Sequence, residues 1–340
     1  MKKATLFLLC LMLFIITAFK LTEKYDFVVP KGWPKPVFDF KKNKLTQEKI
    51  FLGRVLFYDP ILSRDNSISC ASCHSSFHAF THVDHALSHG VGDSIGKRNA
   101  LPLMNLAWQK QFMWDGSISD LNFFSRIPIT HPKEMASSLE DVQFKLKQSD
   151  SYADLFLKAF GDSEINKERI LTSLSAFCIT LVSSNAKYDS VMRHQAKFTL
   201  QEKNGYRLFK QNCASCHKEP LFTDYSFKNN GLSLDKNLND SGRMSVTHQI
   251  DDYRKFKVPT LRNVEYTYPY MHDGRFKKLS QVLNHYSKGI EAVPNLAEQL
   301  KGGLELTSDE RVDIIAFLLT LSDRTFVFNN EFQTPKILMK

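Results

Sequence analysis

Four stretches of the chain carry apolar residues at spacings of three and four, the periodicity that places side chains on one face of an α-helix. Ahead of the last stretch, Thr307-Ser308-Asp309-Glu310 resembles a helix start. The pattern therefore predicts helices over residues 138–148, 151–160, 166–184 and 308–321.

Two long segments, 77–99 and 222–258, lack this periodicity and are rich in Gly, Asp, Asn and His. Loops of this length in a compact domain usually serve a function. The hydrophobic pattern thus predicts a mainly α protein with long loops.

The sequence contains an internal repeat about the size of a domain. Residues 52–57 are echoed by 205–209, Arg98-Asn99 by Arg262-Asn263, and Met113-Trp114-Asp115-Gly116 by Met271-His272-Asp273-Gly274. Two copies of so long a unit indicate tandem domains that meet across an interface. We predict domains over 23–195 and 196–340, with a linker near 193–202.

Composition places the chain among globular proteins. It has 340 residues, 43% hydrophobic and 24% charged, with 14 Gly and 12 Pro, which excludes disordered and collagen-like classes. The net charge of +9 includes leader lysines and is too small to indicate nucleic-acid binding. A basic docking patch for an acidic partner is an alternative to a uniformly solvated surface.

The first 22 residues have the pattern of a secretory signal. Lys2 and Lys3 precede an uncharged run over 4–19, and Cys10 lies within that run. The run is slightly short for a membrane span, and residues 17–19 make a poor cleavage site. We therefore expect an exported, periplasmic protein, with an uncleaved N-terminal anchor as the alternative.

Four of the six cysteines fall in two copies of the pentapeptide Cys-Ala-Ser-Cys-His, at 70–74 and 213–217. C-x-x-C-H is the attachment sequence for c-type haem: both thiols form thioethers and the histidine ligates iron. Zinc binding and C-x-x-C redox chemistry are the alternatives. Cys178, in an apolar helical stretch, is predicted to be a buried free thiol. The sequence thus predicts two covalent haem c groups, held by Cys70, Cys73 and His74 and by Cys213, Cys216 and His217.

Further motifs, in this order, resemble the bacterial dihaem cytochrome c peroxidases, and most nearly their MauG-like branch. The resemblance covers the whole exported chain. It implies two haem domains with haem-wrapping loops, and a periplasmic enzyme that reduces hydrogen peroxide or, in the MauG-like branch, oxidises residues of a partner protein. The motifs are Leu52-Gly53, Gly96-Lys97-Arg98-Asn99, Trp114-Asp115-Gly116, Pro128-Ile129, Pro132-Lys133-Glu134-Met135, Leu261-Arg262-Asn263, 267–272 and His285-Tyr286.

The resemblance implies that the haem on His74 is the reaction centre and that Glu134 acts on peroxide. Peroxide reduction needs an open axial position on iron and a group that moves a proton from the near to the far oxygen. A desolvated carboxyl with a raised pKa can do this. Two residues depart from the family: Phe124 stands where Gln is usual, and Ser117 where Arg is expected. We expect a drier pocket with one hydrogen-bond donor fewer.

Many dihaem peroxidases cap the oxidised reaction centre with a loop histidine until the other haem is reduced. The corresponding position here is Val91, between Gly90 and Gly92, and valine cannot ligate iron. The sequence therefore predicts a reaction centre that is open in the fully oxidised protein. His89, two residues away, is the alternative cap.

The second haem should be six-coordinate and store an electron. Counting from His272, the family's usual Met position falls on Tyr286, which resembles the MauG-like arrangement in which Tyr ligates iron. Phenolate is anionic and stabilises oxidised iron. The alternative distal ligands are His285, Met271 and Met244.

Three further features follow from the resemblance. Trp114 matches the tryptophan between the haems, and an interdomain Ca²⁺ site is implied for Asn99 and the carbonyls of Thr267 and Pro269. For the histidine cluster that includes His82 and His85, we expect surface or propionate-bonding roles rather than a metal site.

The sequence thus favours reduction of H₂O₂ to water with electrons from a small cytochrome c or copper protein. MauG-like oxidation of a partner protein or small molecule and non-catalytic electron transfer are the alternatives. The sequence is compatible with a homodimer.

Overall fold

The computed structural model describes residues 23–339. All four predicted helices are present, with short additional helices around them. The helices are α2 (Gln47–Tyr58), α3 (Cys70–Cys73), α4 (Arg126–Thr130), α5 (Leu139–Lys147), α6 (Asp150–Phe160), α7 (Lys167–Thr180), α8 (Lys187–Met192), α9 (Leu200–Asn212), α10 (Met244–Thr247), α11 (Leu279–Asn284), α12 (Ser308–Leu319) and α13 (Arg324–Val327).

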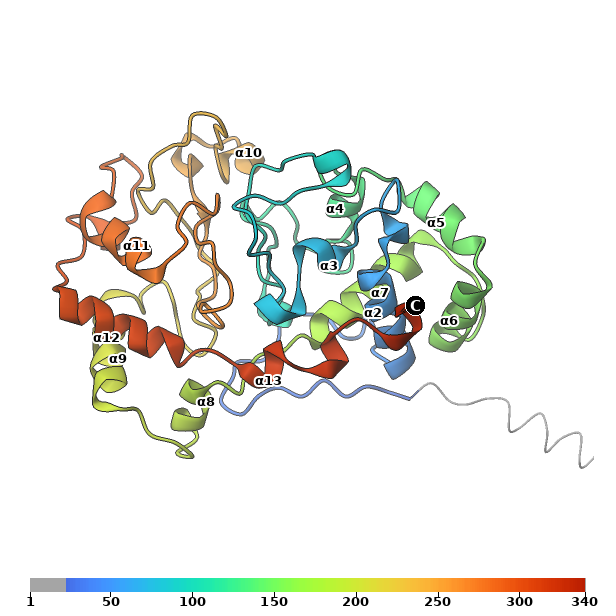
Figure 1. Cartoon of the computed structure of the whole chain (residues 1–340), viewed down its shortest axis with the longest axis horizontal. Helices are drawn as coiled ribbons and strands as arrows, with labels where there is room; N and C mark the ends of the chain where they lie inside the picture. The colour runs from blue at the N-terminus through green and yellow to red at the C-terminus, as the bar shows by residue number, and fades with distance from the viewer. Residues whose placement is uncertain (1–22, 340) are drawn as a thin grey trace, which may run out of the picture.

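The same pair of packed helices occurs in each half: α2 lies against α7, and α9 against α12 (Figure 1). At both contacts a glycine lets the backbones meet. A Cβ on Gly53 would lie 1.9 Å from the carbonyl oxygen of Ser173, and one on Gly205 would lie 1.9 Å from that of Asp313. The sequence repeat is therefore also a repeat of packing.

Helix α7 is shorter than predicted, because it ends at Thr180 rather than near residue 184. The residues that follow use their polar groups elsewhere. Asn105 donates its N–H to the carbonyl of Leu181 (2.8 Å) and accepts from the N–H of Ser183 through its side chain (2.9 Å). These contacts draw the chain out of the helix and along the junction between the halves.

The predicted linker, near 193–202, extends into a helix of the structure. Helix α8 ends at Met192, and α9 begins at Leu200, because the Thr199 hydroxyl accepts from the N–H of Glu202 (3.2 Å) while the Glu202 carboxylate accepts from the N–H of Thr199 (2.7 Å). This reciprocal cap fixes the helix start. The connection is therefore 193–199.

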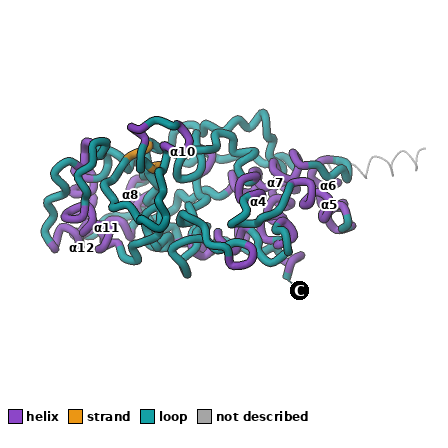
Figure 2. Tube along the Cα trace, turned by 90° about the horizontal axis from the view of Figure 1, so that it is seen from above, coloured by secondary structure: helices purple, strands orange, loops and turns teal. Residues whose placement is uncertain are grey.

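Loops fill the middle of the molecule and helices gather towards its two ends (Figure 2). Segment 77–99 holds only short 3₁₀ turns and bridges. Segment 222–258 holds β1 (Phe227–Lys228) and β2 (Phe256–Lys257), which pair antiparallel. The two long loops predicted from the lack of periodicity are confirmed.

The C-terminal segment crosses to the first half of the chain (Figure 1). Phe326 of α13 is buried in the core that contains α2 and α7. The Tyr58 hydroxyl donates to the carbonyl of Phe332 (2.5 Å), and the Arg54 guanidinium donates to that of Gln333 (2.7 Å). Nothing in the hydrophobic pattern predicted this return.

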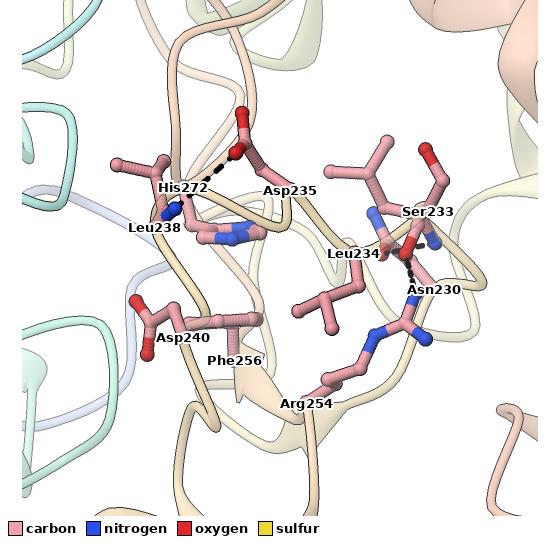
Figure 3. Close-up of a pocket in the computed structure, with 10 residues that line it drawn as sticks. Asn230, Ser233, Leu234, Asp235, Leu238, Asp240, Arg254, Phe256 and His272 are labelled. Carbon is pink, nitrogen blue, oxygen red and sulfur yellow. Dashed lines mark hydrogen bonds between the residues drawn. The ribbon is translucent and has the colours of Figure 1, made fainter.

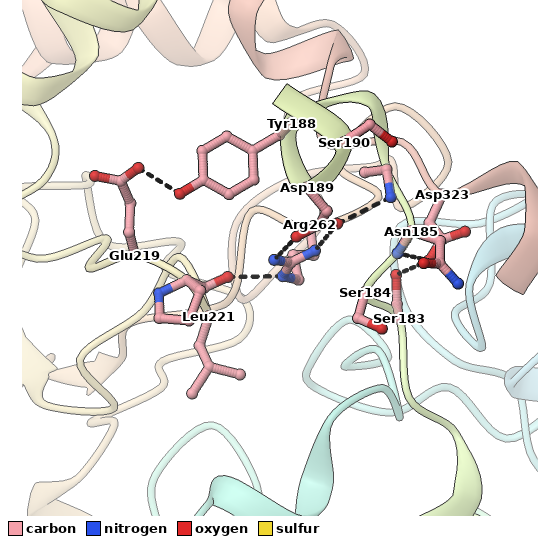
Figure 4. Close-up of polar contacts among 12 residues, drawn as sticks. Ser183, Ser184, Asn185, Tyr188, Asp189, Ser190, Glu219, Leu221, Arg262 and Asp323 are labelled. Atoms are coloured by element: carbon pink, nitrogen blue, oxygen red, sulfur yellow. Dashed lines mark hydrogen bonds and ion pairs between the residues drawn. The ribbon is translucent and has the colours of Figure 1, made fainter. Parts of the chain in front are cut away.

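A fully buried ion pair joins α8 to the second half. Arg262 donates to both carboxylate oxygens of Asp189 (2.8 and 2.9 Å), and its guanidinium lies 4.6 Å from the centre of the Trp33 ring (Figure 4). The Arg262 Nε also donates to the carbonyl of Pro220 (2.8 Å). The pair ties together segments that lie far apart in the sequence.

Within residues 23–339, the structure has no helix of the length and apolarity needed to span a bilayer. The predicted signal, including Cys10, lies outside the described residues.

Candidate active site

The second attachment motif opens into a large, mostly apolar cavity. Its volume is about 210 Å³, whereas one water needs only ~10–15 Å³. Cys213, Cys216 and His217 all line it, together with leucines of α11 and α12. A wide apolar cavity with two thiols and an imidazole at its wall fits a covalently bound haem.

His217 is oriented as an iron ligand would be. Its Nδ1 lies 3.2 Å from the carbonyl oxygens of both Phe222 and Pro259. Because a carbonyl only accepts, Nδ1 carries the proton and Nε2 keeps its lone pair for a metal. Burial lowers the pKa of His217, which keeps the ring neutral.

The first attachment motif repeats this arrangement. His74 Nδ1 lies 2.8 Å from the carbonyl of Phe80, and burial lowers the pKa of His74 to about 4. Phe80 and Phe222 both have a positive φ, 62° and 54°, which bulky residues rarely adopt. The same strained turn therefore aims a carbonyl at the ligand histidine in each half.

The thiols are also placed for attachment. Cys70 and Cys73 form the single turn of α3, and all four motif cysteines are free. Burial raises the pKa of Cys70 and of Cys213 to about 12. These thiols are therefore protonated in the structure. Cys178 is free and buried, as predicted.

The backbone of Glu134 packs against the loop that contacts the first attachment motif. A Cβ on Gly90 would lie 2.5 Å from the carbonyl oxygen of Glu134, and the carbonyl oxygen of the preceding His89 lies 3.8 Å from the Cys73 sulfur. Burial raises the pKa of Cys73, and the charge of Glu134 adds to this effect. The side chain of Glu134 is 40% exposed. Partial burial by the surrounding protein raises the pKa of Glu134, and the charge of His131 opposes this effect. A carboxyl of this kind holds its proton to higher pH than usual.

The loop that could cap this site packs against the backbone of Glu134. The N–H of Val91 donates to the carbonyl of Glu134 (2.8 Å), and Val91 is buried. His89 points to other partners: its Nδ1 lies 2.6 Å from Asp93 Oδ1, and its ring stacks on His85 at 4.3 Å.

The rings of His82, His85 and His89 stack in a row. The His82 and His85 rings stack at 5.1 Å, with Nε2 of His82 3.4 Å from Nδ1 of His85. In the described part of the chain, no three His, Cys, Asp or Glu side chains converge as a metal site.

The two departures from the family lie in structural roles. Phe124 is buried in the first core with its ring 6.0 Å from that of Phe112. Ser117 follows the turn after Trp114 and donates its backbone N–H to Asp115 Oδ1 (3.0 Å). Within residues 23–339, neither Phe124 nor the side chain of Ser117 donates a hydrogen bond near Glu134.

Trp114 comes from the first half of the chain and lines the cavity of the second. Its indole Nε1 donates to the carbonyl of Asn99 (2.9 Å), and its ring lies 6.5 Å from those of Phe256 and His272. Trp114 is 8% exposed. It thus stands at the seam between the two halves.

Of the three residues expected at a Ca²⁺ site, Asn99 and Pro269 meet at this seam, and Thr267 lines the same cavity. The Asn99 side chain lies 2.5 Å from the carbonyl oxygen of Pro269, and both line the cavity along with Thr267. Asn99 and Pro269 are buried.

The four candidate distal ligands are separated by the fold. Tyr286 and Met271 line the cavity. His285 turns away, with its Nε2 3.0 Å from the carbonyl of Asn230, and Met244 opens α10 and does not line the cavity. His285 and Tyr286 are adjacent residues of a π-helical turn over His285–Gly289, and neighbours in a helix point in different directions. Such turns are frequent at functional sites.

Sequence reasoning missed several residues around the cavity. Lys257 is 5% exposed, lines the cavity and donates from Nζ to Gln109 Oε1 (2.9 Å). Arg98, noted only as part of a motif, bridges Asp115 and Asp240 across the seam (2.6 Å to each). No local pattern marks such residues, because their partners are distant in sequence.

A smaller cavity of about 10 Å³ adjoins the large one, with room for roughly one water. Asn230, Asp240, Arg254, Phe256 and His272 line it (Figure 3). His272 stacks on Phe256 at 3.7 Å, and burial lowers the pKa of His272 to about 4.

These features define a class: a mainly helical protein with two covalent haem c sites. A family model for di-haem cytochrome c peroxidase matches residues 47–197, and one for cytochrome c matches residues 202–322. The chain belongs to the dihaem cytochrome c peroxidase family, which includes MauG. The predicted family, the tandem haem fold and the oxidoreductase class are confirmed.

Relatives carry both kinds of name. Methylamine utilization protein MauG of Methylorubrum extorquens is 38% identical over 304 residues, covering 88% of this chain and 84% of that protein. Cytochrome c551 peroxidase of Nitrosomonas europaea is 34% identical, covering 80% and 79%. The structure of a MauG-like protein associated with microbial copper homeostasis superposes with a TM-score of 0.82 at 29% identity, covering 92% of this chain and 99% of that one.

Proposed function

We propose that the protein is an exported dihaem peroxidase that acts in the periplasm. It reduces one H₂O₂ to two H₂O, using two protons and two electrons from a small cytochrome c or copper protein. The observation that carries the proposal is the placement of Glu134, which packs against the loop that contacts the Cys73 thiol; burial also raises the pKa of its carboxyl.

Haem held at this site would supply redox-active iron and the electrons that break the O–O bond of peroxide. Glu134 accepts a proton from one peroxide oxygen and returns it to the other, which leaves as water. His74, oriented by the carbonyl of Phe80, would hold the iron. The Val91 side chain has no group that binds iron and His89 is engaged by Asp93, so neither would compete with the substrate.

Electrons enter through the second half and cross at Trp114. That indole is buried at the seam and lines the second cavity, which supports a role as a stepping stone. Tyr286 is the proposed distal ligand opposite His217. As a phenolate it would stabilise oxidised iron and lower the potential of that centre.

We also propose Ca²⁺ at the seam, held by Asn99 and the carbonyls of Thr267 and Pro269 with waters. The meeting of Asn99 with Pro269 supports this site. Oxygen ligands of this kind suit Ca²⁺. Bound Ca²⁺ would hold the two halves together next to Trp114, whose indole donates to the carbonyl of Asn99.

A second candidate is MauG-like oxidation of a partner protein or small molecule. Tyr286 in the cavity and 38% identity to a MauG protein favour it. Efficient turnover of a small reduced cytochrome separates the two, because the peroxidase reaction requires it. Non-catalytic electron transfer predicts no peroxide consumption at all.

Steady-state peroxide consumption with a reduced cytochrome tests the proposal, comparing the parent with His74→Ala and His217→Ala. We expect His74→Ala to abolish peroxide consumption, whereas His217→Ala should retain peroxide reactivity and lose electron supply from the donor. Equal loss of peroxide reactivity in both variants, with both haems still attached, contradicts the assignment of the first half as the reaction centre.

A further inference from the structure

Asn230 contacts two of the four side chains that could serve as the distal ligand of the second centre. Its amide nitrogen lies 3.5 Å from the sulfur of Met271, and its backbone carbonyl lies 3.0 Å from Nε2 of His285. Asn230 itself lines the large cavity.

The orientation of the Asn230 amide follows from its neighbours. Its Oδ1 accepts the N–H of Leu232 (3.3 Å), so the NH₂ group faces the Met271 sulfur. A thioether sulfur can only accept, so the contact is an N–H donated to Met271. The sulfur is therefore held by the amide of Asn230.

The loop that carries Asn230 is held in place from behind. The N–H of Glu291 donates to the carbonyl of Gly231 (2.8 Å), and a Cβ on Gly231 would lie 2.5 Å from the Ile290 side chain. Figure 3 shows Asn230 at the start of the loop that runs through Leu234 and Leu238. Segment 290–291 directly follows the π-helical turn that presents Tyr286. Asn230 and Tyr286 are therefore fixed relative to each other.

From these contacts we propose that Asn230 is a positioning residue that selects Tyr286 over Met271 and His285 as distal ligand. The inference rests on the proposed role of Tyr286. The amide N–H holds the Met271 sulfur, and the backbone carbonyl engages Nε2 of His285, the nitrogen that would otherwise bind iron. Tyr286 is then the candidate left to serve the cavity that it lines.

Asn230→Asp tests this with little change of shape. Aspartate keeps an oxygen for the N–H of Leu232 but has no hydrogen to donate to Met271, so the sulfur is released to compete with Tyr286 for iron. In the haem-loaded variant we expect loss of the tyrosinate-to-iron charge-transfer absorption and a rise in the midpoint potential of the second centre. Asn230→Leu, which carries no charge, should change both in the same direction. Ser233→Ala, in the same loop, should leave the spectrum of the parent.

Met271→Leu in the Asn230→Asp background completes the test. The thioether-type spectrum expected for Asn230→Asp should disappear in the double variant. A parent-like spectrum and potential in Asn230→Asp overturns the proposal, as does a spectrum of Asn230→Asp that is indifferent to Met271→Leu. Tyr286→Phe reports separately on the ligand: a parent-like spectrum there refutes Tyr286 ligation itself.

Discussion

Replacing Asp189 with asparagine should destabilise the protein strongly, because the partner of this carboxylate is a completely buried cation. The Arg262 guanidinium is 0% exposed and the Asp189 side chain 6% exposed. Asparagine preserves shape and one acceptor oxygen. It places an amide N–H where the second carboxylate oxygen accepted from Arg262, and it removes the only negative charge in contact with that guanidinium among the described residues.

Removing one partner of a buried ion pair costs ~3–5 kcal/mol. The rings of Trp33 and Phe222 lie 4.6 and 5.6 Å from the guanidinium and partly stabilise an uncompensated cation. We therefore expect a loss near ~3 kcal/mol in the free energy of unfolding. The loss should also loosen the turn before Arg262, whose Pro259 carbonyl orients His217.

Equilibrium urea unfolding of the haem-loaded protein, followed by far-UV circular dichroism, measures the change. The matched control is Asp162→Asn. Asp162 also pairs with the two terminal guanidinium nitrogens of an arginine, Arg169, but this pair lies at the surface, where 56% of the Asp162 side chain is exposed. Exposed pairs contribute little, so its urea midpoint should barely move. A shift for Asp189→Asn no larger than that of the control would refute the reasoning.

Three further predictions concern single residues. Glu134→Gln keeps the size of the side chain but cannot carry a proton, so peroxide turnover should fall by ~10² or more with both haem spectra normal; unchanged turnover removes Glu134 from the mechanism. The fully oxidised protein should show a high-spin haem by EPR and bind cyanide without prior reduction; two low-spin haems, one of which becomes high-spin in His89→Ala, would show that His89 caps the site. Burial lowers the pKa of Lys49 to about 8 from 10.5, so the unfolded chain binds more protons between these values and stability should rise with pH across that window relative to Lys49→Met; a constant gap between the two urea midpoints from pH 8 to 10 contradicts this.

Helical periodicity located α5, α6 and α12 well, because each carries buried apolar residues at helical spacing. Their ends coincide with local signals, such as the Ser138 hydroxyl that caps α5 and the Gly161 that ends α6 in a left-handed conformation. The end of α7 was missed, because it depends on Asn105, which is 76 or more residues away in the sequence.

The attachment cysteines and histidines were predictable because spacing alone encodes them. The selection among distal ligands was not, since it depends on tertiary contacts: His285 contacts the carbonyl of Asn230, whereas Tyr286 lines the cavity. Asn230 lies in a loop without periodicity, and its partners Met271 and His285 are distant in sequence. The return of the C-terminal segment to α2 is likewise a matter of tertiary packing.

The stoichiometry of donor oxidation per peroxide tests the central claim most directly. Haem-loaded protein is supplied with an excess of a reduced small cytochrome and a limiting, known amount of H₂O₂. The account predicts that two donor equivalents are oxidised for each H₂O₂ consumed, with no release of O₂. Donor that stays reduced while peroxide persists, or peroxide that disappears with release of O₂, would contradict it.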